Sequence, residues 1–410
     1  MATVLYNIGT LVHFSHVKDE DMGIGSDMAI VIEGDEIVKI QSSSEVTQEY
    51  GVNDHNDHQF IDVKGRAVIP GLVDSHAHLL WAGDRSQEVA WRQEGHTYLD
   101  IANMGGGIAS TVAATRKATE HQLLGLGLER LERARRTGTT HMEVKSGYGL
   151  DTVNELKLLS AADRLQQLKG LPSLDLTWMG AHAAPPGESI DRYVEHLLSE
   201  QLPAVKDQGL ARSMDVFCEP GWFSIEQTAD LLRSGQHAGL DLRLHIDEFE
   251  DGGGGKLATE FLVDTADHAY HTPIEDRMTM TEHGVNTGYL PGTPYAMGDP
   301  FPDMIEVREH NLRYTLATDF NPNCRTLSLP FVGSLMVQRA GLHPLDALRA
   351  VTVSPASITP HPSGRVHGRL VEGSVANLNI LNSCHWESWA LQPSHTPFHS
   401  TMVDGVLTEH

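Results

Sequence analysis

The chain has 410 residues, of which 40% are hydrophobic, and its 55 acidic residues outnumber 30 lysines and arginines to give a formal net charge of −25. This length can bury a large core, and the lack of a basic stripe argues against nucleic acid as a partner. No segment approaches the roughly 20 apolar residues of a membrane span, and the N-terminal residues lack the pattern of a secretion signal. We therefore expect a cytoplasmic protein with no membrane or nucleic-acid partner.

The cysteine and lysine content gives further information about the kind of protein. The cysteines, Cys218, Cys324 and Cys384, are far apart and predict neither a disulfide framework nor a cysteine-type zinc site. Lysine occurs nine times, and none follows Lys256. Repulsion within so acidic a chain is screened in concentrated salt, where the Debye length falls to roughly 3 Å near 1 M. The composition favours adaptation to high salt, with an ordinary acidic cytosolic enzyme as the alternative.

Both ends of the chain predict a small β unit. Short alternating segments punctuated by Gly, Asp and Asn occupy 3–14, 28–40 and 59–65, and similar ones return at 368–382 and 401–410. We expect one β-sandwich built from residues 1–64 and 359–410, surrounding a different domain at 65–358.

The middle of the chain alternates strand-like runs with helical periodicity. The predicted strands are 67–74, 139–144, 174–180, 213–219, 240–246, 265–269, 285–291 and 312–319. Eight strands separated by helical crossovers predict an α/β fold, a closed parallel (β/α)8 TIM-like barrel.

Polar side chains follow four of these strands. The first ends in His76 and His78, the fifth in His245, the sixth in His268 and the eighth in Asp319. Barrel enzymes carry catalytic groups at the C-terminal ends of strands, and residues two apart in an extended segment point the same way. Three histidines and an aspartate can hold one divalent metal ion and leave a position for water. Such an ion lowers the pKa of bound water from 15.7 toward roughly 7.

The motifs around these residues carry a family resemblance. VIPGLVDSHAHL at 68–79 and ATDFNP at 317–322 resemble the signatures of the amidohydrolase superfamily, as does the β unit from both termini. Within it, the stretch 83–85, GGGI at 105–108, EVKSGYGL at 143–150 and GAHAAPP at 180–186 resemble the imidazolonepropionase family. The resemblance covers nearly the whole chain.

This resemblance implies an activity and a set of site residues. The expected reaction, a step of histidine degradation, opens the ring of a small imidazolone carboxylate, 4-imidazolone-5-propanoate, to N-formimidoyl-L-glutamate. One zinc or iron ion per chain would be held by His76, His78, His245 and Asp319. The implied substrate contacts are Arg85, Tyr98, Tyr148, His182, Asn321 and Asn323. Arg85 offers a two-pronged donor for the propionate carboxylate.

The acid–base candidates are Glu248 and His268, acting with Asp319. Glu248 lies three residues past a predicted metal ligand, and the family uses this position near the attacked ring. The hypothesis is that these groups take the proton of water and return one to the ring nitrogen. His268 is equally compatible with a role in orienting a ligand.

Three features depart from the pattern or compete with it. Asn323 stands where many family members have Gly, which leaves the geometry of this turn open, although Asn is the residue that best tolerates a left-handed backbone after Gly. Cys324 is expected to be a buried packing residue rather than a reactive thiol. Lys145 raises the alternative of a carbamylated lysine bridging two metals, although it follows the second strand and four other ligands already form a set. His141 has no spacing partner.

Two rival functions remain at this stage. Another cyclic amidohydrolase or an aminoimidazole-type deaminase would share the metal site, and only Arg85, Tyr98 and Tyr148 favour a small carboxylate-bearing ring. A non-catalytic metal-binding scaffold would be expected to have lost a ligand, Glu248 or His268. A homodimer is compatible with this class of barrel, but the sequence identifies no interface.

Overall fold

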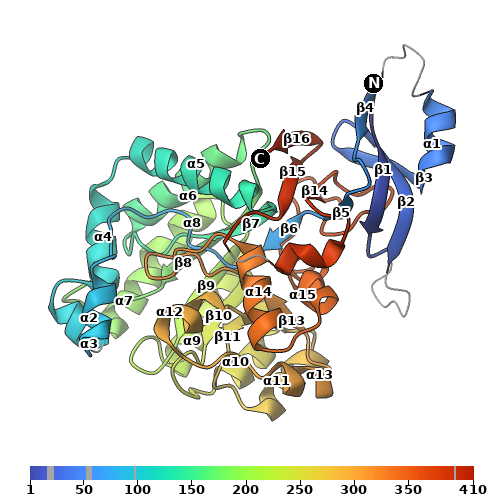
Figure 1. Cartoon of the computed structure of the whole chain (residues 1–410). Helices are drawn as coiled ribbons and strands as arrows, with labels where there is room; N and C mark the ends of the chain where they lie inside the picture. Colours follow the sequence, from blue (N-terminus) through green and yellow to red (C-terminus); the bar gives the residue numbers. More distant parts are fainter. Residues whose placement is uncertain (16–22, 52–57, 97, 392–393) are drawn as a thin grey trace.

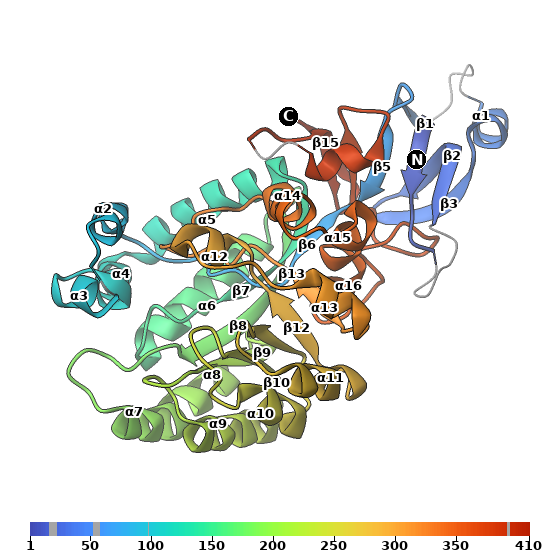
Figure 2. The ribbon, with the colours of Figure 1, turned by 60° about the horizontal axis from the view of Figure 1, so that its bottom comes forward.

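The computed structural model describes residues 1–15, 23–51, 58–96, 98–391 and 394–410. A barrel of strands surrounded by helices makes up most of the chain, and a second sheet lies to one side of it (Figure 1, Figure 2). Within the described residues, no helix has the length and apolar character needed to cross a membrane.

The barrel strands pair in parallel, each with the next along the chain. They are β6 (Leu72–Asp74), β7 (Thr139–Lys145), β8 (Ser173–Ala181), β9 (Ser213–Cys218), β10 (Asp241–Ile246), β11 (Thr265–His268), β12 (Asn286–Tyr289) and β13 (Tyr314–Leu316). Just beyond the ends of β6 and β13, the Asp319 N–H donates to the His76 carbonyl at 3.1 Å and the His78 N–H to the Phe320 carbonyl at 2.8 Å. These bonds draw the first and last strands together, and the predicted barrel fold is confirmed.

Helices fill the connections between barrel strands. They are α2 (Glu88–Gln93), α3 (Tyr98–Asn103), α4 (Gly107–Lys117), α5 (Glu120–Arg136), α6 (Thr152–Gln166), α7 (Ile190–His196), the π-helix η1 (Leu197–Gln201), α8 (Leu202–Gln208), α9 (Ile225–Ala238), α10 (Gly254–Phe261), α11 (Ile274–Glu282), α12 (Gly292–Met297) and α13 (Met304–Glu309). After the last barrel strand, α14 (Leu329–Arg339), α15 (Pro344–Ala350) and α16 (Val353–Ala356) lead toward the second sheet. Helix α9 begins with a capping box, because the Ser224 hydroxyl accepts from the Gln227 N–H and the Gln227 side chain accepts from the Ser224 N–H.

The second sheet joins both ends of the chain, as predicted. Its strands run in the order β16-β15-β14-β5-β1-β2-β3, and β4 also pairs with β1. Their bounds are β1 (Ala2–Val12), β2 (Ile24–Glu33), β3 (Glu36–Ser42), β4 (Gln59–Asp62), β5 (Ala67–Pro70), β14 (Leu378–Leu381), β15 (Phe398–Val403) and β16 (Val406–Glu409), with α1 (Ser43–Tyr50) and the 3-10 helix η2 (Trp386–Ala390) beside them. Alternate residues of β1 and β2 pack in different apolar clusters, Leu5 with Ile30 in one and Val4 with Val31 in another.

The predicted strand 67–74 is two strands that belong to different sheets, so this expectation was wrong. β5 pairs with β1 and β14 in the small sheet, and β6 opens the barrel. Gly71 separates them, and a Cβ atom there would lie 2.3 Å from the Thr140 hydroxyl oxygen. Only glycine allows the chain to pass so close to β7. The division into 1–64, 65–358 and 359–410 stays a prediction, with the crossing between the sheets at Gly71.

Candidate active site

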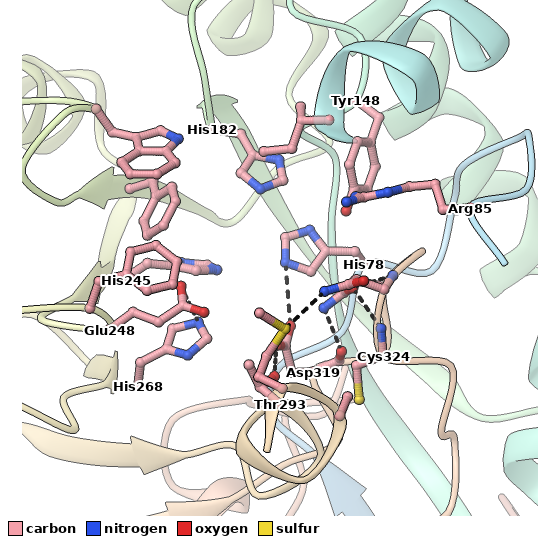
Figure 3. A pocket seen from close by; sticks show the side chains of 18 residues that line it. His78, Arg85, Tyr148, His182, His245, Glu248, His268, Thr293, Asp319 and Cys324 are labelled. Atoms are coloured by element: carbon pink, nitrogen blue, oxygen red, sulfur yellow. Dashed lines mark hydrogen bonds and ion pairs between the residues drawn. The ribbon is translucent and has the colours of Figure 1, made fainter. Parts of the chain in front are cut away.

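A pocket opens at the C-terminal ends of the barrel strands, with about 720 Å³ of empty space including its mouth. The predicted site residues that line it are His78, Arg85, Tyr148, His182, His245, Glu248, His268, Asp319, Asn321 and Asn323. Figure 3 shows Arg85 and Tyr148 across the pocket from Glu248 and His268, with His78 between them. Tyr98 begins α3, and its side chain lies outside the described part of the structure.

Buried nitrogen and oxygen donors converge at the bottom of this pocket. Asp319 Oδ1 lies 3.6 Å from His76 Nε2 and 3.8 Å from His78 Nε2. His76, His78 and Asp319 form one group whose ligand atoms lie within 4.8 Å of one another, and His76, His245 and His268 form a second. The Nε2 atoms of His76 and His245 are buried without a hydrogen-bond partner. Unpaired donors of this kind fit a divalent metal ion.

Carboxylates hold the other ring nitrogens of two of these histidines. His76 Nδ1 lies 2.6 Å from Asp267 Oδ2, and His245 Nδ1 lies 2.9 Å from Asp215 Oδ1. A carboxylate can only accept at neutral pH, so each ring carries its proton on Nδ1 and turns a bare Nε2 toward the pocket. Burial and the coulombic effect of Lys145 both hold the pKa of His76 well below its ordinary value.

Lys145 lies beneath these histidines, on β7. Its Nζ is fully buried between Asp215 Oδ2 at 2.7 Å and Glu143 Oε1 at 2.9 Å. Burial opposes the charge of Lys145, but the two carboxylates outweigh it and raise the pKa of this amine. Because carbamylation needs a neutral amine, the geometry argues against a carbamylated lysine and favours a charged lysine that fixes Asp215.

Glu248 and His268 face each other on the pocket wall opposite Arg85 and Tyr148, with 3.7 Å between Glu248 Oε2 and His268 Nε2. Burial and the nearby charge of Asp319 raise the pKa of Glu248 well above its ordinary value. His268 and Asp319 both have positive φ, 67° and 47°, a costly backbone for residues other than glycine. These turns place His268, the last residue of β11, and Asp319, just past the end of β13, within the two donor groups.

Arg85 is held in place from the rim side of the pocket. Its Nε and one terminal nitrogen each donate to a carboxylate oxygen of Glu88 at 2.8 Å, and Glu88 also accepts from the Gly107 N–H at 2.8 Å. Both side chains are buried, so the pair fixes the guanidinium plane. Glu88 was not predicted from the sequence, although its place three residues after Arg85, at the start of α2, was the available signal.

Aromatic rings form the wall of the pocket between the arginine side and the Glu248–His268 side. His182 stacks on His78 with ring centroids 5.0 Å apart, and Tyr148 meets His182 edge-on at 5.1 Å. The Gly147 carbonyl can only accept, so His182 Nδ1 donates to it at 2.9 Å. Burial and the neighbouring His245 lower the pKa of His182 to about 4, which leaves its ring neutral near pH 7.

Relatives identify the family. The chain is 37% identical over 413 residues to an imidazolonepropionase of Haloarcula marismortui, covering 99% of this chain and 94% of the relative. It is 39% identical to an imidazolonepropionase of Symbiobacterium thermophilum, covering 86% of this chain and 81% of the relative. The chain belongs to the imidazolonepropionase family. No protein-family model matches the chain.

Solved structures with the same fold carry other activities. A Xaa-Pro dipeptidase with methionine bound in its active site superposes with a TM-score of 0.71 and 16% identity, covering 100% of both chains. An adenosine deaminase from Xanthomonas campestris with bound zinc has a TM-score of 0.69 and 14% identity, covering 99% of this chain and 92% of the other. At such low identity these structures show the fold alone.

The family's glycine position after Asp-Phe-Asn-Pro is occupied here by Asn323 in an ordinary backbone conformation. Asn323 is not among the residues with positive φ, so this turn does not use the left-handed backbone that Asn would tolerate. The turn is instead held by Asn321, whose Oδ1 accepts from the Asn323 N–H at 2.7 Å and the Cys324 N–H at 3.0 Å. Such an Asx turn needs no glycine. Asn323 Oδ1 accepts from Arg92 at 2.6 Å.

Cys324 lines the pocket from beneath the turn. Burial raises the pKa of its thiol to about 12, and its Sγ lies 3.8 Å from the Thr318 carbonyl. A thiol that stays protonated is a poor nucleophile and a poor metal ligand. This environment supports the packing role that the sequence predicted for Cys324.

Two parts of this pocket were not predicted from the sequence. Phe217, Trp222 and Phe249 form an aromatic wall, with ring centroids 5.1 Å apart for the first two. The Thr293 hydroxyl, on α12, donates to Asp319 Oδ2. These residues come from β9, from loops and from the short helix α12, with no spacing motif, so only the fold brings them to the pocket.

Proposed function

We propose that this chain hydrolyses 4-imidazolone-5-propanoate to N-formimidoyl-L-glutamate, opening the ring at a cyclic amide C–N bond in histidine degradation. One observation carries this proposal: a convergent histidine–aspartate donor group lies between the Glu248–His268 pair and a fixed arginine. The imidazolonepropionase relatives across nearly the whole chain supply the substrate class.

Four residues would hold one divalent ion, zinc or iron. We assign this role to His76, His78, His245 and Asp319. When bound, the ion acts as a Lewis acid toward the ring carbonyl and makes water a better nucleophile. Asp215 and Asp267 keep the His245 and His76 rings in the tautomer that binds metal.

Glu248 and His268 would move the proton. Glu248, acting from its ionised form, accepts a proton from the attacking water, and its raised pKa makes that carboxylate a stronger base. His268, within 3.7 Å, helps to pass this proton to the ring nitrogen as the C–N bond breaks. Asp319 contributes from the base of the pocket, where Thr293 fixes its second oxygen.

The opposite side of the pocket would bind the substrate. Arg85, oriented by Glu88, pairs with the propionate carboxylate, and Tyr148 and His182 lie against the flat ring. We assign further contacts to Asn321, beside the metal, to Tyr98, and to the turn at Asn323.

We also infer the setting of the enzyme. The acidic, lysine-poor composition supports a cytoplasmic protein that works at high salt, and barrels of this kind are compatible with a homodimer.

Turnover of freshly generated imidazolone propionate tests the proposal. The protein is stripped with a chelator and reloaded with zinc or iron, and loss of the substrate's ultraviolet absorbance is followed at high and low salt. We expect metal-dependent loss with formimidoyl-glutamate as product, and faster turnover at high salt. Folded, metal-loaded protein with no turnover at any salt would overturn this substrate in favour of other cyclic amides or deaminase substrates. Failure to retain stoichiometric metal would point to a scaffold.

A further inference from the structure

A second pocket lies at the opposite end of the barrel from the catalytic residues. It holds about 950 Å³ of empty space and is lined by Asn286 and Tyr314, the first residues of β12 and β13. Helices α15 and α16 pack on β13 (Figure 2), and residues of both helices also line this pocket. The catalytic residues follow the other ends of the same strands, so the two pockets are separate.

Three arginines converge on this second pocket. Arg313 precedes β13, Arg349 lies on α15, and Arg369 lies in the segment that leads to β14. Arg313 is exposed, whereas Arg349 and Arg369 are half-buried. Burial and the charge of Arg349 both lower the pKa of Arg369, so these two guanidinium groups repel each other.

These charges lack the partners that other arginines have. Arg212 pairs with Asp175 at 2.7 Å and Arg277 pairs with Glu306 at 2.5 Å. Within the described ranges, no ion pair joins a carboxylate to any of the three pocket arginines, although Asp346 also lines the pocket. Arg349 contacts the face of the Phe14 ring at 4.7 Å instead. In a chain with a net charge of −25, converging arginines without carboxylate partners indicate a place for an outside anion.

We propose that this pocket binds a small anion with two or more negative charges, of the phosphate or polycarboxylate class. The planar forks of Arg313 and Arg369 match the paired oxygens of such groups. Ser354, Ser357 and the Tyr314 hydroxyl line the same pocket and offer neutral hydrogen bonds. This site is independent of the proposed ring-opening reaction.

Calorimetric titration of the metal-loaded protein tests the proposal, with inorganic phosphate and citrate as separate probes at an ionic strength fixed with potassium chloride. The test variant is R313Q/R369Q, which spares Arg349 because of its packing on Phe14. The control variant R308Q/R339Q removes two exposed arginines and changes the net charge equally. Both variants should keep the wild-type circular dichroism, because the test variant removes groups that lack carboxylate partners.

We expect one equivalent of at least one probe to bind the wild type and the control with equal affinity. The dissociation constant should rise at least about tenfold in R313Q/R369Q, because two charge-assisted contacts are lost. Binding of phosphate alone or of citrate alone would decide the class of the anion. Binding that persists in R313Q/R369Q would place the anion elsewhere, including at the metal centre, and overturn the proposal. The absence of binding by either probe would also overturn it.

Discussion

The barrel buries a histidine cluster at each of its ends, and only one of them has the arrangement of a metal site. At the catalytic end are His76, His78, His245 and His268. At the other end, the ring centroids of His141 and His367 are 4.8 Å apart, and His361 lies 5.7 Å from His141. All three of these rings are buried.

The two clusters differ in what holds the rings. His141 Nδ1 lies 2.8 Å from the Ser173 hydroxyl, His367 Nε2 donates to the Thr359 carbonyl at 2.8 Å, and His361 is paired with Asp404 at 3.2 Å. Among the described residues, convergent metal-donor groups occur only at the catalytic end. Burial and proximity of histidines are therefore not sufficient. At the catalytic end, Asp267 and Asp215 hold the Nδ1 atoms of His76 and His245 and leave their Nε2 atoms bare near Asp319. At the far end, the carboxylate of Asp404 instead occupies Nε2 of His361.

The largest expected effect comes from removing one histidine from each cluster. His245→Ala should lower kcat/KM at least about a thousandfold, because it removes a metal donor. His141→Gln should keep kcat/KM within about threefold, because it contacts no proposed catalytic group. Metal content and steady-state kinetics of both variants check this contrast. A similar loss in both would mean that the far cluster also supports catalysis.

Glu248→Gln should lower kcat by roughly 10²–10⁴-fold while metal stays bound, because only proton transfer is removed. Its side chain keeps the same size, so the wall of the pocket should be preserved. Kinetics together with metal analysis separate this role from a structural one. Near-normal turnover would exclude Glu248 from proton transfer.

Asp267→Asn should weaken metal affinity roughly 10–100-fold, because the His76 tautomer is no longer fixed. Asp215→Asn should do the same for His245 and should also destabilise the protein by about 3–5 kcal/mol, because it removes a partner of buried Lys145. Competition with a chelator measures the affinity, and urea unfolding measures the stability. Equal stability of the two variants would contradict the role given to Lys145.

The smallest effect concerns stability and pH at the far cluster. Burial and the charge of His361 lower the pKa of His367 to about 4, below the unfolded value of about 6.5. As pH falls below 6.5, the unfolded chain takes up a proton that the folded chain does not, so stability is lost. By pH 5 this histidine should cost about 2 kcal/mol.

His367→Gln should therefore lose less stability between pH 7 and pH 5 than the wild type. Urea unfolding at both pH values measures the difference, with His237→Gln, at an exposed position on α9, as the control. A pH dependence unchanged by His367→Gln would show that the histidine is not held neutral.

The sequence predicted the barrel and the catalytic cluster because both follow local rules. Strand periodicity locates the ends of strands, and His76, His78, His245 and Asp319 stand at or just past those ends. The far cluster follows no such rule. His141 is on β7, whereas His361 and His367 come from a segment more than 200 residues later, and only the fold joins them.

The features that were missed depend on particular side-chain contacts, two of them local and one between distant parts of the chain. The role of Glu88 follows from the hydrogen bonds that it accepts from Arg85. The shape of the turn at Asn323 follows from the hydrogen bond that the Asn321 side chain accepts there. The split of the strand at Gly71 depends on Thr140, whose side chain leaves no room for a Cβ atom. The spacing of three residues between Arg85 and Glu88 was a usable signal, whereas the contact between Gly71 and Thr140 has no local spacing that would predict it.

The crossing at Gly71 has a consequence for how the protein is made. Only Gly71 lies between the end of β5 and the start of β6, and β6 is followed by His76 and His78. β5 is anchored by β14, which pairs Leu378 with Pro70 and is synthesised about 300 residues later at the ribosome. A contact over such a distance forms slowly. The first two proposed metal ligands are therefore among the earliest site residues synthesised, but the strand before them is locked only when nearly the whole chain has emerged.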